Sequence, residues 1–329
     1  MQIIDLHCDS IMKLMSNPQL SLYDKGGHVD LIKLKDGNYL LQCFAMFVNL
    51  KKVDNPYEYC KKMISLYYEN INKYSNIISH VNNYQDILIN HQNNLISSLL
   101  TIEEGGVLLG DVKKLEEFYK LGVRMITLTW NYPNEIGNPN IDSTKITSKT
   151  TYDELIKMID TTKGLTPKGI ELIKKMEELG IIIDVSHLGD AGVRDVLKYT
   201  TKPFVASHSN ARRICNFPRN LPDDLLIEMA KRQCLIGINY CPNFLSEQSN
   251  SMKISDVIRH IDYLKTLIGV DYIALGSDFD GIEGNLELED ASFLPLLIVE
   301  LKKSGYSDDE IDKITHKNAL RLFKEVLHE

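Results

Sequence analysis

Two histidines stand at the ends of two short apolar runs that lie close together in the sequence. The segment "IDVSHLGD" carries His187, and the segment "FVASHSNAR" carries His208. A single histidine in such a position is usually a structural hydrogen-bonding group. Neighbouring strands, however, lie about 4.8 Å apart, so two histidines at adjacent strand ends can share a metal ion. The repeated Ser-His pair therefore predicts part of a metal site.

The amino-terminal segment "IIDLHCDS" offers a second pair of metal ligands. His7 and Asp9 are two residues apart, and on a strand this spacing points both side chains to the same side. An imidazole and a carboxylate on one face form an ordinary half-site for Zn²⁺. The competing interpretation is a strand-end turn in which Asp9 caps the helix that follows.

Carboxylates end two further apolar runs. In "TIEEGG", Glu104 stands directly before two glycines, at a tight turn where it could bridge two ions. Glu103 competes with it, and periodicity alone does not decide between them; a solvated acidic turn is the structural alternative. In "LGSDFDG", Asp278 ends another run. A carboxylate beside a metal-activated water can act as a general base and then as the acid for a leaving amine.

These side chains need an architecture that gathers strand ends. Eight short apolar runs, rich in β-branched residues, alternate with amphipathic stretches, as expected of parallel strands covered on both faces. The alternation predicts a (β/α)8 TIM barrel, in which functional groups collect at the carboxyl ends of the strands. A doubly wound open sheet fits the strand count less well, and no glycine-rich nucleotide loop supports it. The predicted strands are 2–8, 40–48, 95–103, 124–130, 180–187, 203–208, 234–240 and 272–278. The predicted helices are 56–75, 111–121, 166–178, 190–199, 222–232, 254–268, 293–303 and 308–327.

One segment departs from the regular alternation. After the fourth predicted strand, residues 131–163 are polar, contain Pro133 and Pro139, and include a short helix near 152–160. The segment is too long for a routine barrel loop, so we expect it to cover the mouth of the barrel. No linker or internal repeat is visible, and we expect a single domain over residues 1–329.

Composition narrows the class of protein. The chain has 329 residues, of which 43% are hydrophobic and 25% charged, as in ordinary globular proteins. A net charge of −8 argues against a nucleic-acid or acidic-membrane partner. No signal peptide is visible, and no apolar run approaches the roughly 20 residues that span a bilayer. The six cysteines form no C-x-x-C pair, which favours free thiols and a cytoplasmic location.

The ordered set of motifs resembles the membrane (renal-type) dipeptidase family, the M19 metallopeptidases, in a bacterial-type soluble form. The motifs "DLHCD", "EGG", "RMITLTWN", "GLTPKG", "LGIIIDVSH", "PFVASHSNAR", "RNLPDD" and "LGSDFDG" follow the family's order over nearly the whole chain. Each motif alone is weak, but the ordered set is highly specific.

The resemblance implies a (β/α)8 barrel that holds two Zn²⁺ ions per chain. His7 and Asp9 match the ligands of one ion, and His187 and His208 match those of the other. The glutamate before the two glycines matches the bridging ligand, which favours Glu104 over Glu103.

The resemblance also assigns residues to the substrate. Asp278 matches the catalytic aspartate, and Arg219 in "RNLPDD" matches the arginine that contacts the terminal carboxylate, a role that suits the planar guanidinium. Trp130 stands where animal members carry a histidine, which leaves oxyanion stabilisation and substrate range open. We assign Trp130 and Asn239, at the end of the predicted strand 234–240, to substrate binding.

We therefore expect a zinc-dependent dipeptidase that cleaves small dipeptides, L,D-dipeptides included, by attack of a metal-bridging hydroxide. The first alternative is another binuclear amidohydrolase, such as a cyclic-amide hydrolase or a deaminase. Those barrels usually open with H-x-H, whereas this chain has H-x-D. The second alternative is a catalytically silent metal-binding barrel. Small dipeptides are the expected partners, and because family members are often dimers, a homodimer is compatible with the resemblance.

Overall fold

Eight parallel strands form the centre of the computed structural model, which describes residues 1–17, 19–23, 26–159 and 161–328. These strands are β1 (Ile3–Cys8), β2 (Tyr39–Phe47), β4 (Ile96–Glu103), β5 (Val123–Thr127), β6 (Ile182–Asp184), β7 (Val205–Ala206), β8 (Leu235–Ile238) and β10 (Ile273–Leu275). In space they follow the order β2, β1, β10, β8, β7, β6, β5 and β4, and a pairing between β4 and β2 closes the ring. The predicted (β/α)8 TIM barrel is confirmed.

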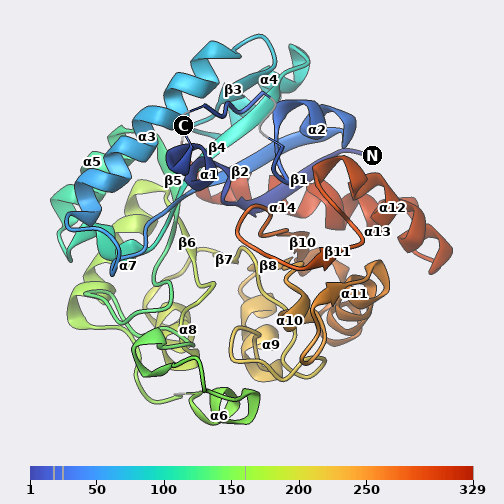
Figure 1. Cartoon of the computed structure of the whole chain (residues 1–329). Coiled ribbons are helices and arrows are strands. Elements are labelled where there is room, and N and C mark those ends of the chain that lie inside the picture. Colours follow the sequence, from blue (N-terminus) through green and yellow to red (C-terminus); the bar gives the residue numbers. More distant parts are fainter. Residues whose placement is uncertain (18, 24–25, 160, 329) are drawn as a thin grey trace.

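Helices surround the barrel (Figure 1). Those that fall in predicted helical stretches are α3 (Pro56–Lys73), α5 (Val112–Lys120), α7 (Pro167–Leu179), α8 (Asp190–Tyr199), α9 (Asp223–Lys231), α11 (Ile254–Ile268), α12 (Leu294–Lys303), α13 (Asp308–Asp312) and α14 (Asn318–Val326). Helix α7 shows why the sequence signals were reliable. Thr166 Oγ1 accepts the backbone N–H of Gly169 at 3.0 Å, proline begins the helix, and Gly180 ends it with φ 74°.

The sequence missed several short elements. These are α2 (Leu31–Asp36), β3 (Ile78–His80), α4 (Tyr84–Gln92), α10 (Pro242–Leu245), β9 (Ser251–Met252) and β11 (Asn285–Leu286). Helix α1 (Ser10–Ser16) does follow Asp9, whose side chain makes no capping hydrogen bond to it. Strand β3 pairs only with the first residues of β4, on the side that β5 occupies further along. Three residues are too few to give an alternation signal, so the helix that follows was missed with the strand.

Five of the predicted strands end two or three residues earlier than expected. The ladder stops at Thr127 in β5, Asp184 in β6, Ala206 in β7, Ile238 in β8 and Leu275 in β10. His187 has φ 67°, a left-handed conformation that a continuous strand does not contain. The functional candidates beyond these strands therefore lie in turns rather than on the strands themselves.

The long segment after β5 lies beside the barrel mouth. It contains a 3-10 turn, η2 (Ser143–Lys145), and the short helix α6 (Tyr152–Lys157); residue 160, in the predicted helical range 152–160, lies outside the described residues. Tyr152 donates its hydroxyl proton to the carbonyl of Asn216 at 2.9 Å, and its ring packs near Phe217. The segment is thereby attached to the loop that follows β7.

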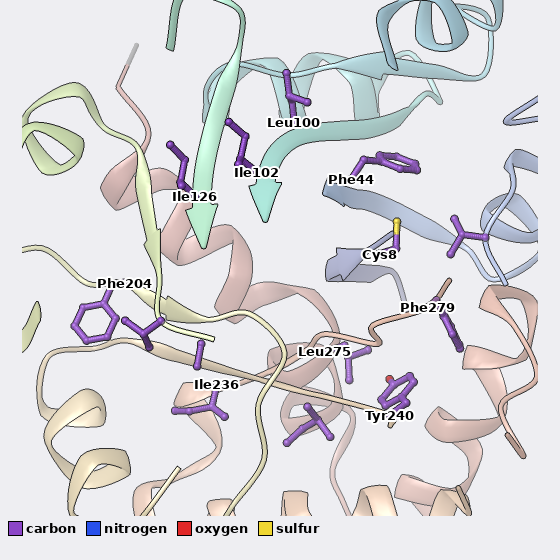
Figure 2. Packing of buried hydrophobic residues seen from close by; sticks show 14 of the residues in the cluster. Cys8, Phe44, Leu100, Ile102, Ile126, Phe204, Ile236, Tyr240, Leu275 and Phe279 are labelled. Carbon is purple, nitrogen blue, oxygen red and sulfur yellow. The ribbon is translucent and has the colours of Figure 1, made fainter. Parts of the chain in front are cut away.

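Two layers of apolar side chains hold the barrel together. The inner layer takes residues from all eight barrel strands, which only the barrel interior can bring together; Leu99 of β4 and Met125 of β5 are examples. Helix α14 adds Leu322 and Phe323 to this layer and so closes one end of the barrel. The outer layer lies between strands and helices, and Figure 2 shows part of it, including Ile102.

The closure by α14 predicts a large stability effect at Phe323. This side chain has no exposed surface, so Phe323→Ala should leave a cavity and lower the free energy of unfolding by about 3–5 kcal/mol. Glu325→Ala, on the exposed face of the same helix, should change it by less than about 0.5 kcal/mol. Denaturant unfolding followed by circular dichroism measures both. Equal midpoints for the two variants would contradict the role of α14 as a plug.

Candidate active site

Imidazoles and carboxylates meet beyond the carboxyl ends of the barrel strands. His7 Nε2 lies 3.4 Å from Asp9 Oδ2, 3.3 Å from Glu103 Oε2 and 3.9 Å from Asp278 Oδ1. These side chains come from β1, β4 and the turn after β10, and each is largely buried. Side-chain atoms of His7, Asp9 and Asp278 lie within 4.8 Å of one another, so Asp278 adjoins the two groups that could hold a metal ion.

A second group of ligand atoms meets the other carboxylate oxygen of Glu103, and one of its members, His208, also lies within 4.8 Å of His7. His187 Nε2 is 3.0 Å from His208 Nε2 and 3.0 Å from Glu103 Oε1, and His208 Nε2 is 3.7 Å from the same oxygen. The two oxygens of Glu103 thus face two different sets of ligands. Oε2 faces His7, and Oε1 faces the histidine pair.

The structure corrects the choice between the two glutamates. Glu104, the predicted bridging residue, directs its carboxylate away from the histidines, toward the backbone N–H groups of Gly106 and Trp130. Glu103 is the last residue of β4 and pairs with Thr127 of β5, so strand alternation points it into the barrel mouth. The position before the two glycines has φ 102°, which turns the chain away from the site.

Hydrogen bonds fix the ring orientation and the tautomer of His187 and His208. Asn131 Oδ1 lies 2.9 Å from His187 Nδ1, and Ser207 Oγ lies 2.7 Å from His208 Nδ1. Ser207 donates its hydroxyl proton to Asp184, so its oxygen is left to accept from His208. With Nδ1 protonated in both rings, each Nε2 keeps a free lone pair for a metal.

Two buried aspartates hold the strand ends in the same way. Asp184 of β6 accepts the backbone N–H and the hydroxyl of Ser207, at 2.9 and 2.6 Å. Asp5 of β1 accepts the same two groups of Ser277, at 2.8 and 2.6 Å. Each serine directly precedes a site residue, His208 or Asp278. Neither aspartate was among the predicted site residues, although a charged residue inside an apolar run was a visible signal.

Asn239 holds Asp278 rather than opening toward the cavity. Its Nδ2 donates to Asp278 Oδ2 at 2.8 Å and to the carbonyl of His208 at 3.3 Å, while its Oδ1 accepts the backbone N–H of Cys241. The side chain is fully buried. Asn239 was predicted to bind substrate, but its contacts make it a support for the carboxylate of Asp278, which itself has φ 63°.

The electrostatics of the site favour neutral imidazoles at the histidine pair. Burial, with the positive charge of Arg219 in second place, lowers the pKa of His187 well below its usual value. Burial and the charge of His7 lower the pKa of His208 in the same direction. Only a neutral imidazole can coordinate a metal, so both rings are in the required state near neutral pH.

The carboxylates are in the opposite situation. Burial, reinforced by the charge of Asp9, raises the pKa of Glu103. Burial is also the largest cause that raises the pKa of Asp278, and Asp9 adds to it. Three carboxylates are therefore crowded together where water solvates them poorly, and a cation placed between them would stabilise their charged forms.

The orphaned atoms fit a metal as well. Among the described residues, His7 Nε2 and Asp9 Oδ1 are buried without a hydrogen-bond partner. Buried polar atoms of this kind are rare in proteins, and a bound ion is one of the explanations. The donor set of imidazoles and carboxylates is the one that Zn²⁺ and similar divalent ions use.

A cavity of about 620 Å³ lies over these ligands, which is the size of a small-molecule site. Asp9, Glu103, His187 and Asp278 line it at the bottom. The pairing of β9 with β11 joins the loops after β8 and β10 into one wall. The residues that line the walls include Phe47, Trp130, Asn131, Phe244 and Ile282.

Arg219 is buried next to the site with part of its hydrogen-bonding capacity unused. Its Nη2 donates to the carbonyl of His208 at 3.2 Å, and its guanidinium lies 5.3 Å from the ring centre of Phe244. Nε and Nη1 have no partner among the described residues, although the side chain is only 2% exposed. A buried guanidinium with free donors is suited to an anionic group of a ligand.

A parallel barrel whose strand ends combine histidines and carboxylates is the architecture of metal-dependent hydrolases. A family model described as membrane dipeptidase, peptidase family M19, matches residues 1–328. The chain therefore belongs to the membrane dipeptidase family, as its motifs predicted, and its class is that of dipeptidase hydrolases.

Individual relatives agree with this assignment. An uncharacterized dipeptidase of Schizosaccharomyces pombe is 30% identical over 349 residues, which cover 98% of this chain and 80% of the relative. A dipeptidase of Aspergillus oryzae is 31% identical over 313 residues, 92% of this chain and 71% of the relative. The crystal structure of the dipeptidase AC, a metallo peptidase of family M19, has a TM-score of 0.89 at 25% identity and covers 99% of both chains.

The word "membrane" in the family description finds no counterpart in the helices. Nowhere in the described part of the chain does a helix combine the length and the apolar character that crossing a bilayer requires.

Gly281 tests the geometry of the ligand cluster. A Cβ added there would lie 2.1 Å from Asp9 Oδ2 and 2.7 Å from Asp278 Oδ1. Gly281→Ala should displace these carboxylates and weaken metal binding by about 10- to 100-fold. Isothermal titration calorimetry of the metal-free protein with Zn²⁺ measures the change in affinity. Glu289→Ala, at an exposed position of the same loop outside the cavity lining, is the control. Unchanged zinc affinity in Gly281→Ala would rule out this arrangement.

Proposed function

We propose that this chain is a metal-dependent dipeptidase that binds two Zn²⁺ ions and hydrolyses small dipeptides, L,D-dipeptides included. The observation that carries the proposal is the position of Glu103, whose Oε2 lies 3.3 Å from His7 Nε2 and whose Oε1 lies 3.0 Å from His187 Nε2. A single carboxylate between two ligand sets is what a binuclear site needs.

The residues divide between the two ions as the resemblance implies, with Glu103 in place of Glu104. His7 and Asp9 would hold one ion, His187 and His208 the other, and Glu103 would hold both. When bound, the ions lower the pKa of the attacking water and polarise the scissile carbonyl.

Asp278 is the proposed catalytic residue. Asn239 holds its Oδ2, so that Oδ1 remains directed toward the ligand cluster. Burial raises the pKa of this carboxyl above its usual value, so its carboxylate form is a stronger base toward the attacking water. Asp278 would take a proton from the attacking water and deliver it to the leaving amine.

The remaining contacts select the substrate. We infer that the free donors of Arg219 meet the terminal carboxylate of a dipeptide and that the indole of Trp130 forms a wall of its pocket. A cavity of about 620 Å³ agrees with a substrate of two residues.

Three accompanying expectations remain predictions. The first is a single domain over residues 1–329. The second is a cytoplasmic location, for which the support is that all six cysteines are free thiols. The third is a homodimer, for which the support is the family resemblance alone.

Removal of metal and of Glu103 tests the binuclear site. Treatment with a chelator should abolish release of free amino acids from L-alanyl-D-alanine, and added Zn²⁺ should restore it. Glu103→Gln should lower the zinc content from two ions per chain, measured by elemental analysis, because one oxygen of the proposed bridge is lost. Glu135→Gln, at an exposed position, is the matched control. Full zinc content in Glu103→Gln would contradict the bridging role.

Asp278→Asn tests the proton transfer separately from metal binding. The variant should retain zinc, because Asp278 is not one of the proposed ligands, and its kcat should fall by about 10²- to 10⁴-fold. Near wild-type turnover of the zinc-loaded variant would remove Asp278 from the mechanism. Bound zinc with no cleavage of any dipeptide by the unmodified protein would instead favour a silent metal-binding barrel.

A further inference from the structure

Glu104 is left without a function once Glu103 takes the place in the ligand cluster. Its side chain has no exposed surface, and its carboxylate points away from the histidines. The backbone at this residue has φ 102°, a conformation that favours glycine. A buried carboxylate in a strained backbone position costs free energy, so the contacts that it makes must offset that cost.

The two oxygens of Glu104 accept hydrogen bonds from three places. Oε1 accepts the backbone N–H of Gly106 at 2.7 Å and the Nδ2 proton of Asn134 at 2.5 Å. Oε2 accepts the backbone N–H of Trp130 at 3.1 Å. The carboxylate therefore joins the turn after β4 to the start of the long segment after β5.

Asn134 extends this link through the whole turn of residues 128–137. Its Nδ2 also donates to the carbonyl of Leu128 at 2.9 Å, and its Oδ1 accepts the backbone N–H groups of Ile136 and Gly137. The turn is folded around Asn134, and Glu104 is the group that fixes Asn134 to the barrel.

The same turn carries two parts of the site. The indole of Trp130 lines the cavity and packs edge-on against Phe47, with ring centres 4.9 Å apart. The next residue, Asn131, contacts His187 Nδ1 at 2.9 Å. The turn therefore carries both a cavity wall and a contact of His187.

We propose that Glu104 is a positioning residue, which holds the backbone of Trp130 so that the indole forms the substrate-facing wall beside His187. The inference rests on the proposed function only in its kinetic consequence. The structural link stands on the hydrogen bonds themselves.

Glu104→Gln is the selective variant. When the side-chain carbonyl oxygen of the glutamine takes the place of Oε1, it still accepts hydrogen bonds from Gly106 and Asn134. Its NH2 group then faces the backbone N–H of Trp130, and two donors cannot form a hydrogen bond. The reverse orientation opposes two donors instead of one, so the first is favoured. The substitution thus removes mainly the link to Trp130.

Trp130 reports on its own position, because it is the single tryptophan of the chain. In zinc-loaded Glu104→Gln we expect a red-shifted indole emission, stronger quenching by acrylamide and an unchanged zinc content. The KM for L-alanyl-D-alanine should rise by about fivefold or more, with a smaller change in kcat. Glu135→Gln, an exposed glutamate of the same turn, should change none of these quantities.

Glu104→Gly separates the hydrogen bonds from the backbone strain. Glycine accepts the positive φ without strain but removes all three hydrogen bonds, so the changes at Trp130 should be at least as large as in Glu104→Gln. Unchanged emission and quenching in both variants would overturn the proposal, and so would loss of zinc from Glu104→Gln. If the unmodified protein cleaves no dipeptide, the proposed function fails, while the emission of Trp130 still decides the role of Glu104.

Discussion

The burial of Glu103 among three imidazoles and two further carboxylates is the constraint on which the site depends. Such a cluster is unfavourable unless hydrogen bonds or a cation offset the cost of burying its charges. Neighbouring side chains supply part of this offset through hydrogen bonds. Asn131 and Ser207 set the histidine tautomers, Asn239 holds Asp278, and the position of each group follows from its strand. The barrel holds these residues in place, because its strands end at the same level around the barrel mouth.

The register of the strands explains why these heights agree. Glu103 pairs with Thr127, and Thr127 pairs with Asp184, so three neighbouring strands reach the rim at one level. Thr127 then donates its hydroxyl proton to Asp184 at 2.6 Å. The Asp184–Ser207 and Asp5–Ser277 pairs make the same two hydrogen bonds at two places on the barrel. Each pair fixes the direction of the residue that follows the serine, because a short strand alone cannot define it.

The barrel, and the meeting of most candidate residues at one rim, could be predicted from sequence, because helix caps, apolar runs and strand-end histidines are local signals. The choice between Glu103 and Glu104 could not. Leu99, Thr101 and Glu103 share one strand face, but Leu100 and Ile102 make the other face equally apolar. The sequence pattern therefore does not show which face points into the barrel. Asn239 was assigned to substrate because its contacts with distant segments leave no trace in the local sequence.

The plug formed by α14 also affects how molecules move through the site. The interior layer fills the barrel below the ligands, and α14 closes its far end. The cavity over Glu103 is therefore closed at its inner end. The two amino acids leave by the same mouth through which the dipeptide enters. Substrate and products therefore share one entrance, and a product that dissociates slowly blocks binding of the next substrate.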